Sequence, residues 1–348
     1  MRNALRKTEA DTNRTAGAST FRALLLTCIL IAAVGCEQPS GTTASLQAPT
    51  SGGSLMQQAD LIIRQALADP DPRLRANAIE VVEVTKQVRL MPKVQRLLAD
   101  QSVPVRFLAI LAVGDLQYAL AKESIAQALN DQNENIRIAA AYAMTRFGHS
   151  EYVQVFRNAV ASQDQTVRAN AALLLGKTGD RSALRFLYWT LQRKDSADKV
   201  ILQAAESIAM LGDERIYPKL WTRLISAYAD DRVLGVRAMG ALGTAEAKNA
   251  LITMLDDAVL EVRLAAAEQL GKLNDRTGEP EVLDVFKKNL TAGQSSDDRE
   301  RVNRLTALAI GEIGTDRLAK YLPQLLRDES KSVRLAAAKA VFRREMKN

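Results

Sequence analysis

One pattern of apolar and polar positions recurs from about residue 56 to the end of the chain. Each copy holds an apolar stretch, an acidic residue, an anchor position six residues later that is usually Arg, and a small residue three positions after the anchor. The first four anchors are 31 residues apart, and the later copies are less regular. The expected anchors are Arg75, Arg106, Arg137, Arg168, Ile201, Arg237, Arg263, Arg304 and Arg334. The pattern therefore predicts nine units.

The residues around the anchors indicate that every unit packs in the same way. The positions six before the anchors hold Asp69, Asp100, Asp131, Ser162, Asp195, Asp231, Asp257, Asp298 and Asp328. The positions three after them hold Ala78, Ala109, Ala140, Ala171, Ala204, Gly240, Ala266, Ala307 and Ala337. Small residues allow two helices to approach closely, so we expect a tight helix contact at this point of each unit.

Helix signals divide each unit into two antiparallel helices. Residues that cap helices, such as Asp71 and Asn133, stand four positions before the anchor, and Pro72 falls in the first turn that follows. Beyond the anchor, Val167, Ala171 and Leu174 share one helix face at a period of 3.6 residues. Glycines stand near the ends of the second helices, where we expect them to close the helix into a turn, at Gly176, Gly212, Gly243, Gly271 and Gly314.

The repeated D-x4-V-R-x2-A pattern, with Leu-Gly near the end of the second helix, resembles the HEAT repeat family. It is most similar to the short form of about 30 residues found in phycobilisome-lyase-like proteins. The resemblance implies an all-α fold, a right-handed α-solenoid of about nine stacked two-helix repeats, over residues 56–348. Units of such an array cover each other's apolar faces, so only the array ends need caps. HEAT arrays share architecture rather than chemistry, and their exposed surfaces bind other macromolecules.

Composition agrees with stacked helices and limits the chemistry. The chain is 47% hydrophobic but only 5% aromatic, so small aliphatic residues must fill the core. Of the formal net charge of +7, a share of +3 lies before residue 36, which leaves +4 over the repeats with both signs interspersed. That distribution is not typical of nucleic-acid binding, and we expect no nucleic-acid partner. The two cysteines, Cys28 and Cys36, both precede the repeats, which can therefore form no disulfide or thiolate metal site.

The N-terminal segment has the layout of an export signal. Residues 1–22 are polar and rich in Arg, and an apolar run of 12 residues, 23–34, follows them. This run is far shorter than the roughly 20 residues that cross a bilayer as a helix. We expect a signal peptide over residues 1–35. An ordinary signal peptide with a chance cysteine and a buried apolar helix are the alternatives.

The end of this segment, Ala33-Val34-Gly35-Cys36, resembles the bacterial lipobox, with Ala33 where that motif usually has Leu. The resemblance implies cleavage between Gly35 and Cys36 and lipid attachment to Cys36. Residues 36–55 are rich in Ser, Thr, Gly and Pro and are expected to form a flexible tether. Glu37 follows the cysteine where the Gram-negative sorting rule requires Asp for inner-membrane retention. An outer membrane lipoprotein facing the periplasm is therefore expected, with the outer face of the cytoplasmic membrane as the alternative.

The repeated Asp and Arg are interpreted as a structural ladder rather than a binding stripe, because they recur in phase with the units. The Asp closes the turn between the two helices, and the Arg bridges to a carboxylate of its own or the preceding unit. The only histidine, His149, lies in a polar turn. The Asp pairs at 230–231, 256–257 and 297–298 lie where the repeat itself requires an acidic residue. Iron-binding HEAT hydroxylases use paired His-Glu motifs, which one histidine cannot supply. We expect no catalytic, cofactor-binding or metal-binding residues.

Aromatic residues gather in units five and six, which hold both tryptophans. Tyr188, Trp189, Tyr217 and Trp221 are candidate partner-binding residues, since exposed Trp and Tyr anchor many interfaces. Alternatively, these larger side chains fill a wider gap where the unit length increases.

These observations favour a lipid-anchored, non-enzymatic scaffold that binds a protein or peptide in the cell envelope. A cell-wall or polysaccharide-binding module and a chromophore-lyase-like protein are the alternatives.

Overall fold

The computed structural model describes residues 54–347. The predicted signal peptide, the lipid-attachment site and nearly all of the tether therefore lie outside the described residues. The repeat array begins at Leu55, one residue before the predicted start.

The described chain consists of nine helix pairs, and it contains no strand. The outer helices are α1 (Leu55–Ala66), α3 (Met91–Arg96), α5 (Lys122–Ala128), α7 (Val153–Ala159), α9 (Leu184–Gln192), α11 (Tyr217–Leu224), α13 (Ala245–Thr253), α15 (Glu279–Lys287) and the divided α17 (Asp316–Ala319) and α18 (Leu322–Leu325). The inner helices are α2 (Pro72–Val84), α4 (Val103–Asp115), α6 (Glu134–Arg146), α8 (Gln165–Lys177), α10 (Asp198–Met210), α12 (Ala229–Leu242), α14 (Leu260–Lys272), α16 (Ser296–Ile313) and α19 (Lys331–Glu345). The predicted fold, a right-handed α-solenoid of nine two-helix repeats, is confirmed.

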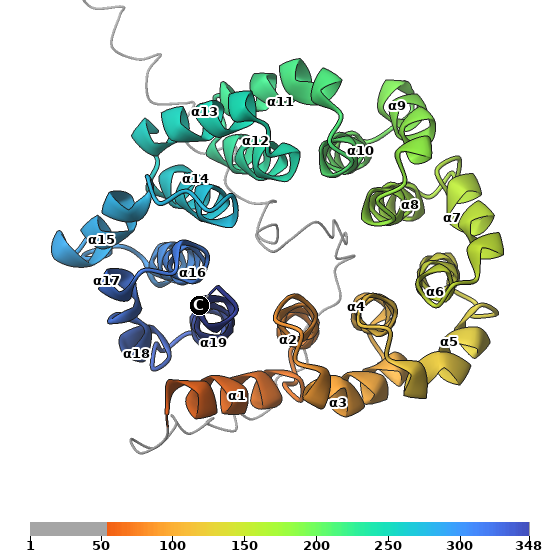
Figure 1. The fold of residues 1–348 in the computed structure, drawn as a ribbon, viewed down its shortest axis with the longest axis horizontal. Coiled ribbons are helices and arrows are strands. Elements are labelled where there is room, and N and C mark those ends of the chain that lie inside the picture. Colours follow the sequence, from red (N-terminus) through yellow and green to blue (C-terminus); the bar gives the residue numbers. More distant parts are fainter. Residues whose placement is uncertain (1–53, 348) are drawn as a thin grey trace, which may run out of the picture.

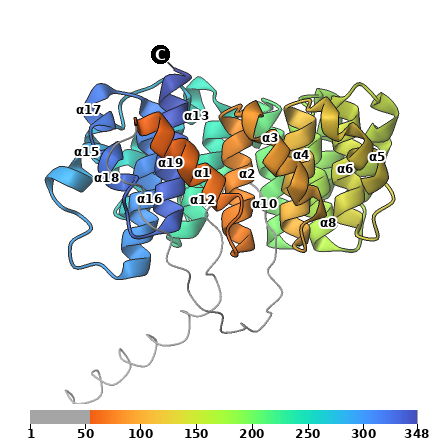
Figure 2. The same cartoon turned by 90° about the horizontal axis from the view of Figure 1, so that it is seen from below.

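The solenoid closes into a ring (Figure 1). The inner helices surround a central axis, the outer helices form the rim, and α1 of the first unit packs against α19 of the last. The view from the side shows the same contact between the two ends of the array (Figure 2). The expectation that the array ends need caps is therefore wrong, because each end covers the apolar face of the other.

Helix starts in the array are capped largely as the sequence predicts. Asp71 accepts a hydrogen bond from the backbone N–H of Arg73, and Asn133 accepts one from Asn135. Pro72 occupies the first turn of α2, where its missing N–H leaves no intrahelical bond unmade.

The glycines near the helix ends have two different roles. Gly212, Gly243 and Gly314 have φ values of 67°, 66° and 74°, so they close the turns as predicted. In contrast, Gly176 and Gly271 lie inside α8 and α14. A Cβ on Gly176 would lie 2.7 Å from the Cβ of Ser207, so this glycine allows two neighbouring inner helices to touch.

Candidate functional site

The predicted acidic residues close the turns between the helices of their units. Their carboxylates accept the backbone N–H of the residue two positions later, at 2.7 to 3.0 Å. The residues that do so are Asp69, Asp100, Asp131, Asp257 and Asp328. The structural interpretation accounts for these acids through local hydrogen bonds.

The anchor arginines reach back over the same turns. The Nη1 atoms of Arg75, Arg106, Arg137, Arg263 and Arg334 donate to the carbonyl oxygens six and five residues earlier. Arg75 also donates two hydrogen bonds to Asp100 of the next unit, both at 2.8 Å. Arg75 therefore bridges to the following unit, whereas a bridge to a carboxylate of its own or the preceding unit was expected.

The predicted register of unit six is wrong by five residues. Arg232, not Arg237, donates to the carbonyls of Ser226 and Ala227 and to the carboxylate of Asp257 at 2.7 and 2.9 Å. Asp231 lies in the first turn of α12 and accepts a hydrogen bond from the hydroxyl of Ser226 at 2.9 Å. Ser226 stands where most other units have the turn acid. Asp231 and Arg237, five residues further along, have the same spacing as an acid and its anchor, so they matched the sequence pattern falsely.

The register of unit eight is wrong by one residue. Asn303, not Arg304, bonds forward to Asp328, with its Nδ2 2.9 Å from the carboxylate. Asp298 lies in the first turn of α16, where it pairs with Arg301 at 2.6 Å. The anchors observed in the structure are Arg75, Arg106, Arg137, Arg168, Ile201, Arg232, Arg263, Asn303 and Arg334.

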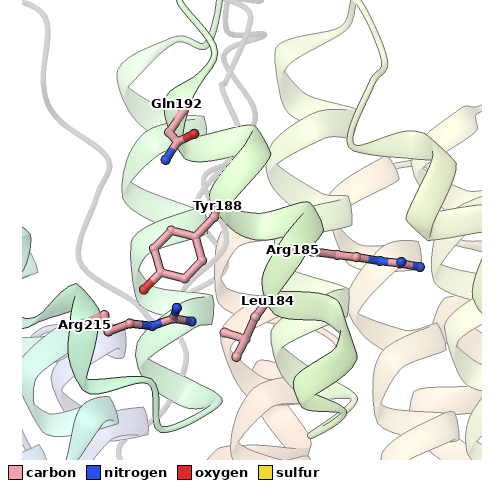
Figure 3. A pocket seen from close by; sticks show the side chains of 5 residues that line it. All are labelled: Leu184, Arg185, Tyr188, Gln192 and Arg215. Atoms are coloured by element: carbon pink, nitrogen blue, oxygen red, sulfur yellow. The ribbon is translucent and has the colours of Figure 1, made fainter.

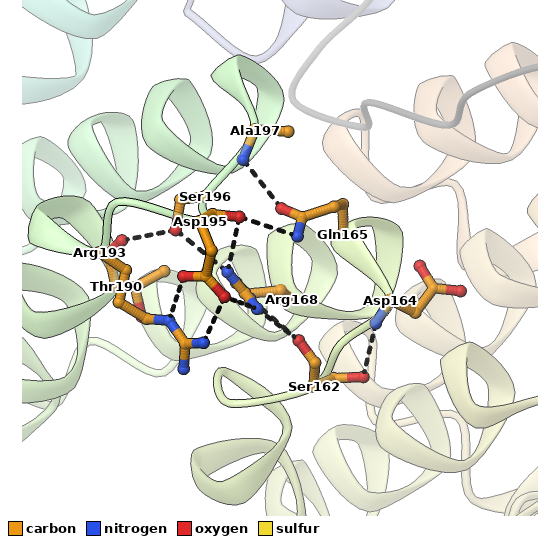
Figure 4. Close-up of polar contacts among 9 residues, drawn as sticks. All are labelled: Ser162, Asp164, Gln165, Arg168, Thr190, Arg193, Asp195, Ser196 and Ala197. Atoms are coloured by element: carbon orange, nitrogen blue, oxygen red, sulfur yellow. Dashed lines mark hydrogen bonds and ion pairs between the residues drawn. The ribbon is translucent and has the colours of Figure 1, made fainter.

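Unit five has no anchor arginine, and its turn is held by Arg168 of the preceding unit and by Arg193 of the turn itself (Figure 4). Arg168 is fully buried and donates to the carbonyl of Ser162 and to the carboxylate of Asp195. Arg193 donates a second pair of hydrogen bonds to the same carboxylate. These hydrogen bonds, first those of Arg193 and then those of Arg168, hold the pKa of Asp195 well below its usual range.

The predicted aromatic residues lie on the outer helices α9 and α11 of units five and six. Trp189 on α9 is 45% exposed and Trp221 on α11 is 38% exposed. Tyr188 and Tyr217 are half-buried and pack partly against the core. The tyrosines therefore fit the interpretation that they fill space between helices, whereas partner binding by the solvent-facing tryptophans stays a prediction. We call the exposed part, Trp189, Trp221 and neighbouring Tyr228, the outer aromatic surface.

Arginines cover the faces of these rings. The guanidinium carbon of Arg193 lies 4.6 Å from the ring centre of Trp189, and that of Arg215 lies 5.1 Å from Tyr188. A groove runs between α9 and the turn that carries Arg215, with Tyr188 and Arg215 turned toward each other (Figure 3). Burial, with the charge of Asp213, raises the pKa of Tyr188. Flat rings covered by guanidinium groups suit contact with a protein surface.

The inner side of the ring carries a charged cluster that the sequence analysis missed. The Nζ of Lys177 on α8 lies 2.9 Å from Glu83 on α2 and 2.8 Å from Asp115 on α4. The hydroxyl of Tyr142 on α6 donates to Asp115 at 2.6 Å. Because α2 and α8 are not neighbours in the ring, this lysine joins distant helices (Figure 1). In the sequence the three charged members stand at or next to the last residue of their helices, which was the one available signal.

Burial shifts the ionisation of this cluster. It raises the pKa of Glu83 to about 7, against the attraction of Lys177 and with help from the negative charge of Asp115. Burial alone would lower the pKa of Lys177, but Glu83 and Asp115 raise it above its ordinary value. The lysine therefore stays protonated at neutral pH and is not a nucleophile, whereas Glu83 exchanges a proton near neutrality.

A second cluster, which also includes α2, lies where the last units meet the first. The Nζ of Lys339 lies 2.9 Å from Glu80, and that of Lys272 lies 2.9 Å from Glu268. Burial alone would raise the pKa of Glu268, but Lys272, Arg237 and Lys339 lower it. Arg237 and Arg304, which have no place in the ladder, lie beside these pairs.

The remaining predicted features of the sequence lie at turns. His149 precedes a short helical turn, and its Nδ1 lies 3.3 Å from Glu151. Within residues 54–347, no three His, Cys, Asp or Glu side chains gather as metal ligands would. None of the helices in this part of the chain has the length and apolarity needed to cross a membrane.

Several solved structures match this chain at low sequence identity and with low TM-scores. Human deoxyhypusine hydroxylase is 19% identical, with 76% of this chain and 98% of that chain covered and a TM-score of 0.36. The complex of CpcE and CpcF of phycocyanin lyase from Nostoc sp. is 16% identical, with 72% and 94% covered and a TM-score of 0.39. Kap121p is 14% identical, with 82% and 37% covered and a TM-score of 0.35.

Sequence comparison identifies the family. No curated protein sequence matches this chain. The family model for HEAT repeats matches four overlapping stretches, residues 90–173, 122–209, 153–236 and 217–303, which together span more than half of the chain. These stretches include the ladder turns of units two to seven. The chain therefore belongs to the HEAT repeat family.

Proposed function

We propose that this protein is a lipid-anchored, non-enzymatic scaffold that binds a protein or peptide partner in the cell envelope. The outer aromatic surface carries the proposal. Trp189, Trp221 and Tyr228 expose large rings on adjacent units, and Arg193 covers one of them. Aromatic residues with arginine are enriched among the residues that dominate binding energy in protein interfaces.

The ladder carboxylates and Lys177 have structural partners that account for them. The ladder carboxylates hold backbone N–H groups, and Lys177 is held in its charged form between two carboxylates. These arrangements support a binding role over catalysis.

Crosslinking tests the partner and its position. A photo-crosslinking residue in place of Trp221 is expected to capture one envelope protein, whose affinity for the purified ring is then measured. The double variant Trp189→Ala/Trp221→Ala is expected to weaken this affinity at least tenfold. The matched control is Leu120→Ala, which removes an apolar side chain that is 78% exposed elsewhere on the ring. Unchanged affinity in the double variant would exclude this surface as the site.

The polysaccharide alternative has one specific observation in its favour. Tyr217 and Trp221 are stacked, with ring centres 6.2 Å apart and planes 21° apart, which offers a flat platform of the kind that sugars contact. Sedimentation with peptidoglycan that depends on these two rings would favour the cell-wall module over the protein scaffold.

Lipid attachment at Cys36 rests on the lipobox resemblance, as does the outer membrane, periplasm-facing location. The Cys36→Ser variant is expected to remain unprocessed and to incorporate no palmitate analogue. Normal labelling of this variant would exclude Cys36 as the attachment site and leave the partner-binding proposal untouched.

A further inference from the structure

The groove between α9 and the turn that carries Arg215 can hold an apolar side chain. It offers about 500 Å³ and is lined mainly by apolar atoms, which belong to Leu184, Arg185, Tyr188, Gln192 and Arg215. The ring of Tyr188 faces the guanidinium of Arg215, while the side chain of Arg185 points to the other side of α9 (Figure 3). The groove therefore combines an apolar lining with polar groups at its borders, as binding sites for flexible ligands usually do.

The two outer helices that adjoin this groove carry positive charge and no carboxylate. α9 contains one charged residue, Arg185, and α11, which begins two residues after Arg215, contains Lys219 and Arg223. Arg223 pairs with Asp231 at 3.3 Å. Arg185 and Lys219 are exposed and form no ion pair within residues 54–347. Two cations therefore lack a counterion on the helices that expose the two tryptophans.

The turns next to these helices add no net charge. Residues 193–197, before α10, contain two cations and one acid, and residues 211–216, after α10, contain one cation and two acids. Asp195 and Asp213 in these turns are each held by an arginine. The excess positive charge therefore lies on α9 and α11 themselves.

Three exposed residues of α9 share one face of the helix. Arg185, Trp189 and Gln192 are spaced by four and three residues, so they follow one another along its outer side. A chain segment that lies along this face meets a cation, an aromatic ring and an amide, with the groove beside it. Carboxylates complement the cation through strong charge-assisted hydrogen bonds, and complementary charge guides association and fixes orientation.

We propose that the groove, together with Arg185 and Lys219, binds an acidic peptide segment of the partner protein. An apolar side chain of the segment fills the groove, and its carboxylates neutralise the two cations. The groove favours a peptide over a lipid surface, because a flat membrane would leave it unfilled. This inference rests on the proposed scaffold function and states the chemistry of the partner.

Tryptophan fluorescence reports binding at this surface, because both tryptophans of the chain, Trp189 and Trp221, lie on these two helices. Random peptides displayed on phage are selected on the purified full chain, and the selected sequences are synthesised and titrated. We expect peptides that combine several Asp or Glu with a large apolar residue and that change the tryptophan emission. Replacing their acids by Asn and Gln should weaken binding by about tenfold or more.

Three outcomes of the selection would overturn the inference. They are selected peptides without acidic residues that change the emission, equal binding of the Asn and Gln counterparts, and the absence of any peptide that changes the emission. In all three cases the scaffold proposal stands, since its own test is the effect of Trp189→Ala/Trp221→Ala on the crosslinked partner.

A pair of double variants shows whether the two cations are responsible. Arg185→Glu/Lys219→Glu is expected to weaken binding of the acidic peptides by about tenfold or more, with an unchanged melting temperature because both side chains are exposed. The matched control, Lys320→Glu/Arg327→Glu, reverses two exposed cations in unit nine, and Lys320 lies over an aromatic ring as Arg185 does. Equal peptide affinity in the two double variants would overturn the inference. So would binding of phosphatidylglycerol vesicles that depends on Arg185 and Lys219 and displaces the peptides, which would assign the surface to a membrane.

Discussion

Lys331, at the start of the last inner helix, donates to the buried carboxylate of Asp69 in the first unit, with 2.8 Å between Nζ and Oδ2. The two residues are 262 positions apart in the chain. Asp69 also accepts the backbone N–H of Asp71, so the acid that closes the first turn also joins the two ends of the ring. A repeat residue thereby acquires a second role that exists only because the array closes.

Reversing the charge of Lys331 should loosen the closure. In Lys331→Glu a second carboxylate would face Asp69. We expect the free energy of unfolding to fall by about 1 kcal/mol or more, because the ion pair is lost and a repulsion is added. Hydrogen exchange in α1 should become faster, since this helix packs on α19 across the junction. Lys320→Glu, an exposed change outside the junction, is the control. Equal exchange rates in α1 of both variants would contradict the role of the pair.

Replacing anchor arginines should reveal the contribution of the bridge to the next unit. Arg75 and Arg106 each donate to two carbonyls of their own turn, but Arg75 alone also forms the double hydrogen bond to Asp100. Arg75→Ala should therefore lower the free energy of unfolding by about 2–3 kcal/mol, and Arg106→Ala should lower it by about 1 kcal/mol. Denaturation midpoints compare the two variants, and equal losses would show that the forward bridge contributes nothing.

The pH dependence of stability should report Glu83. Its pKa is raised from 4.5 to about 7 in the folded protein, so the folded chain takes up this proton before the unfolded chain does as the pH falls. The stability that this raised pKa contributes is fully present below pH 4.5 and is lost as the pH rises through 7. Asp115 has a lowered pKa, so its contribution is lost only in more acidic solution.

Melting curves at pH 8 and pH 5.5 measure this contribution in the natural chain and in Glu83→Gln. On acidification, the free energy of unfolding of the natural chain should rise by on the order of 1–2 kcal/mol more than that of the variant, which has no titratable group at position 83. Glu123→Gln, at an exposed position, is the control and should follow the natural chain. The same pH dependence in Glu83→Gln would show that another group is responsible.

A methyl group at Gly176 should separate two inner helices. In Gly176→Ala the new Cβ would lie 2.7 Å from the Cβ and 2.9 Å from the Cα of Ser207, which forces the helices apart. We expect this overpacking to lower the free energy of unfolding by about 1–3 kcal/mol. Thr145 occupies the equivalent position of unit three, so a side chain fits there, and Thr145→Ala should lose only the hydrogen bond to Tyr142, about 1 kcal/mol. A smaller loss in Gly176→Ala than in Thr145→Ala would contradict the packing argument.

The sequence by itself determined the local structure of this protein. Turn acids such as Asp100 and Asp131, caps such as Asp71 and small residues after the anchors act within one unit, over a few residues of chain, so their spacing predicted nine helix pairs. The prediction of register failed at Arg237 and Arg304. In both units the turn lacks the usual acid–arginine pair, and a nearby match of similar type was available.

Only the tertiary structure decided the closure and the charged interior. Whether nine units form an open array or a ring depends on the small rotation between successive units, which accumulates along the array and leaves no signature in any single repeat. Closure brings Lys331 to Asp69, and the inward curvature brings Lys177 to Glu83, which is 94 positions away in the chain. The shifted pKa values of Glu83 and Arg304 arise mainly from burial on the inner side of the ring, and burial depends on that curvature rather than on residue spacing.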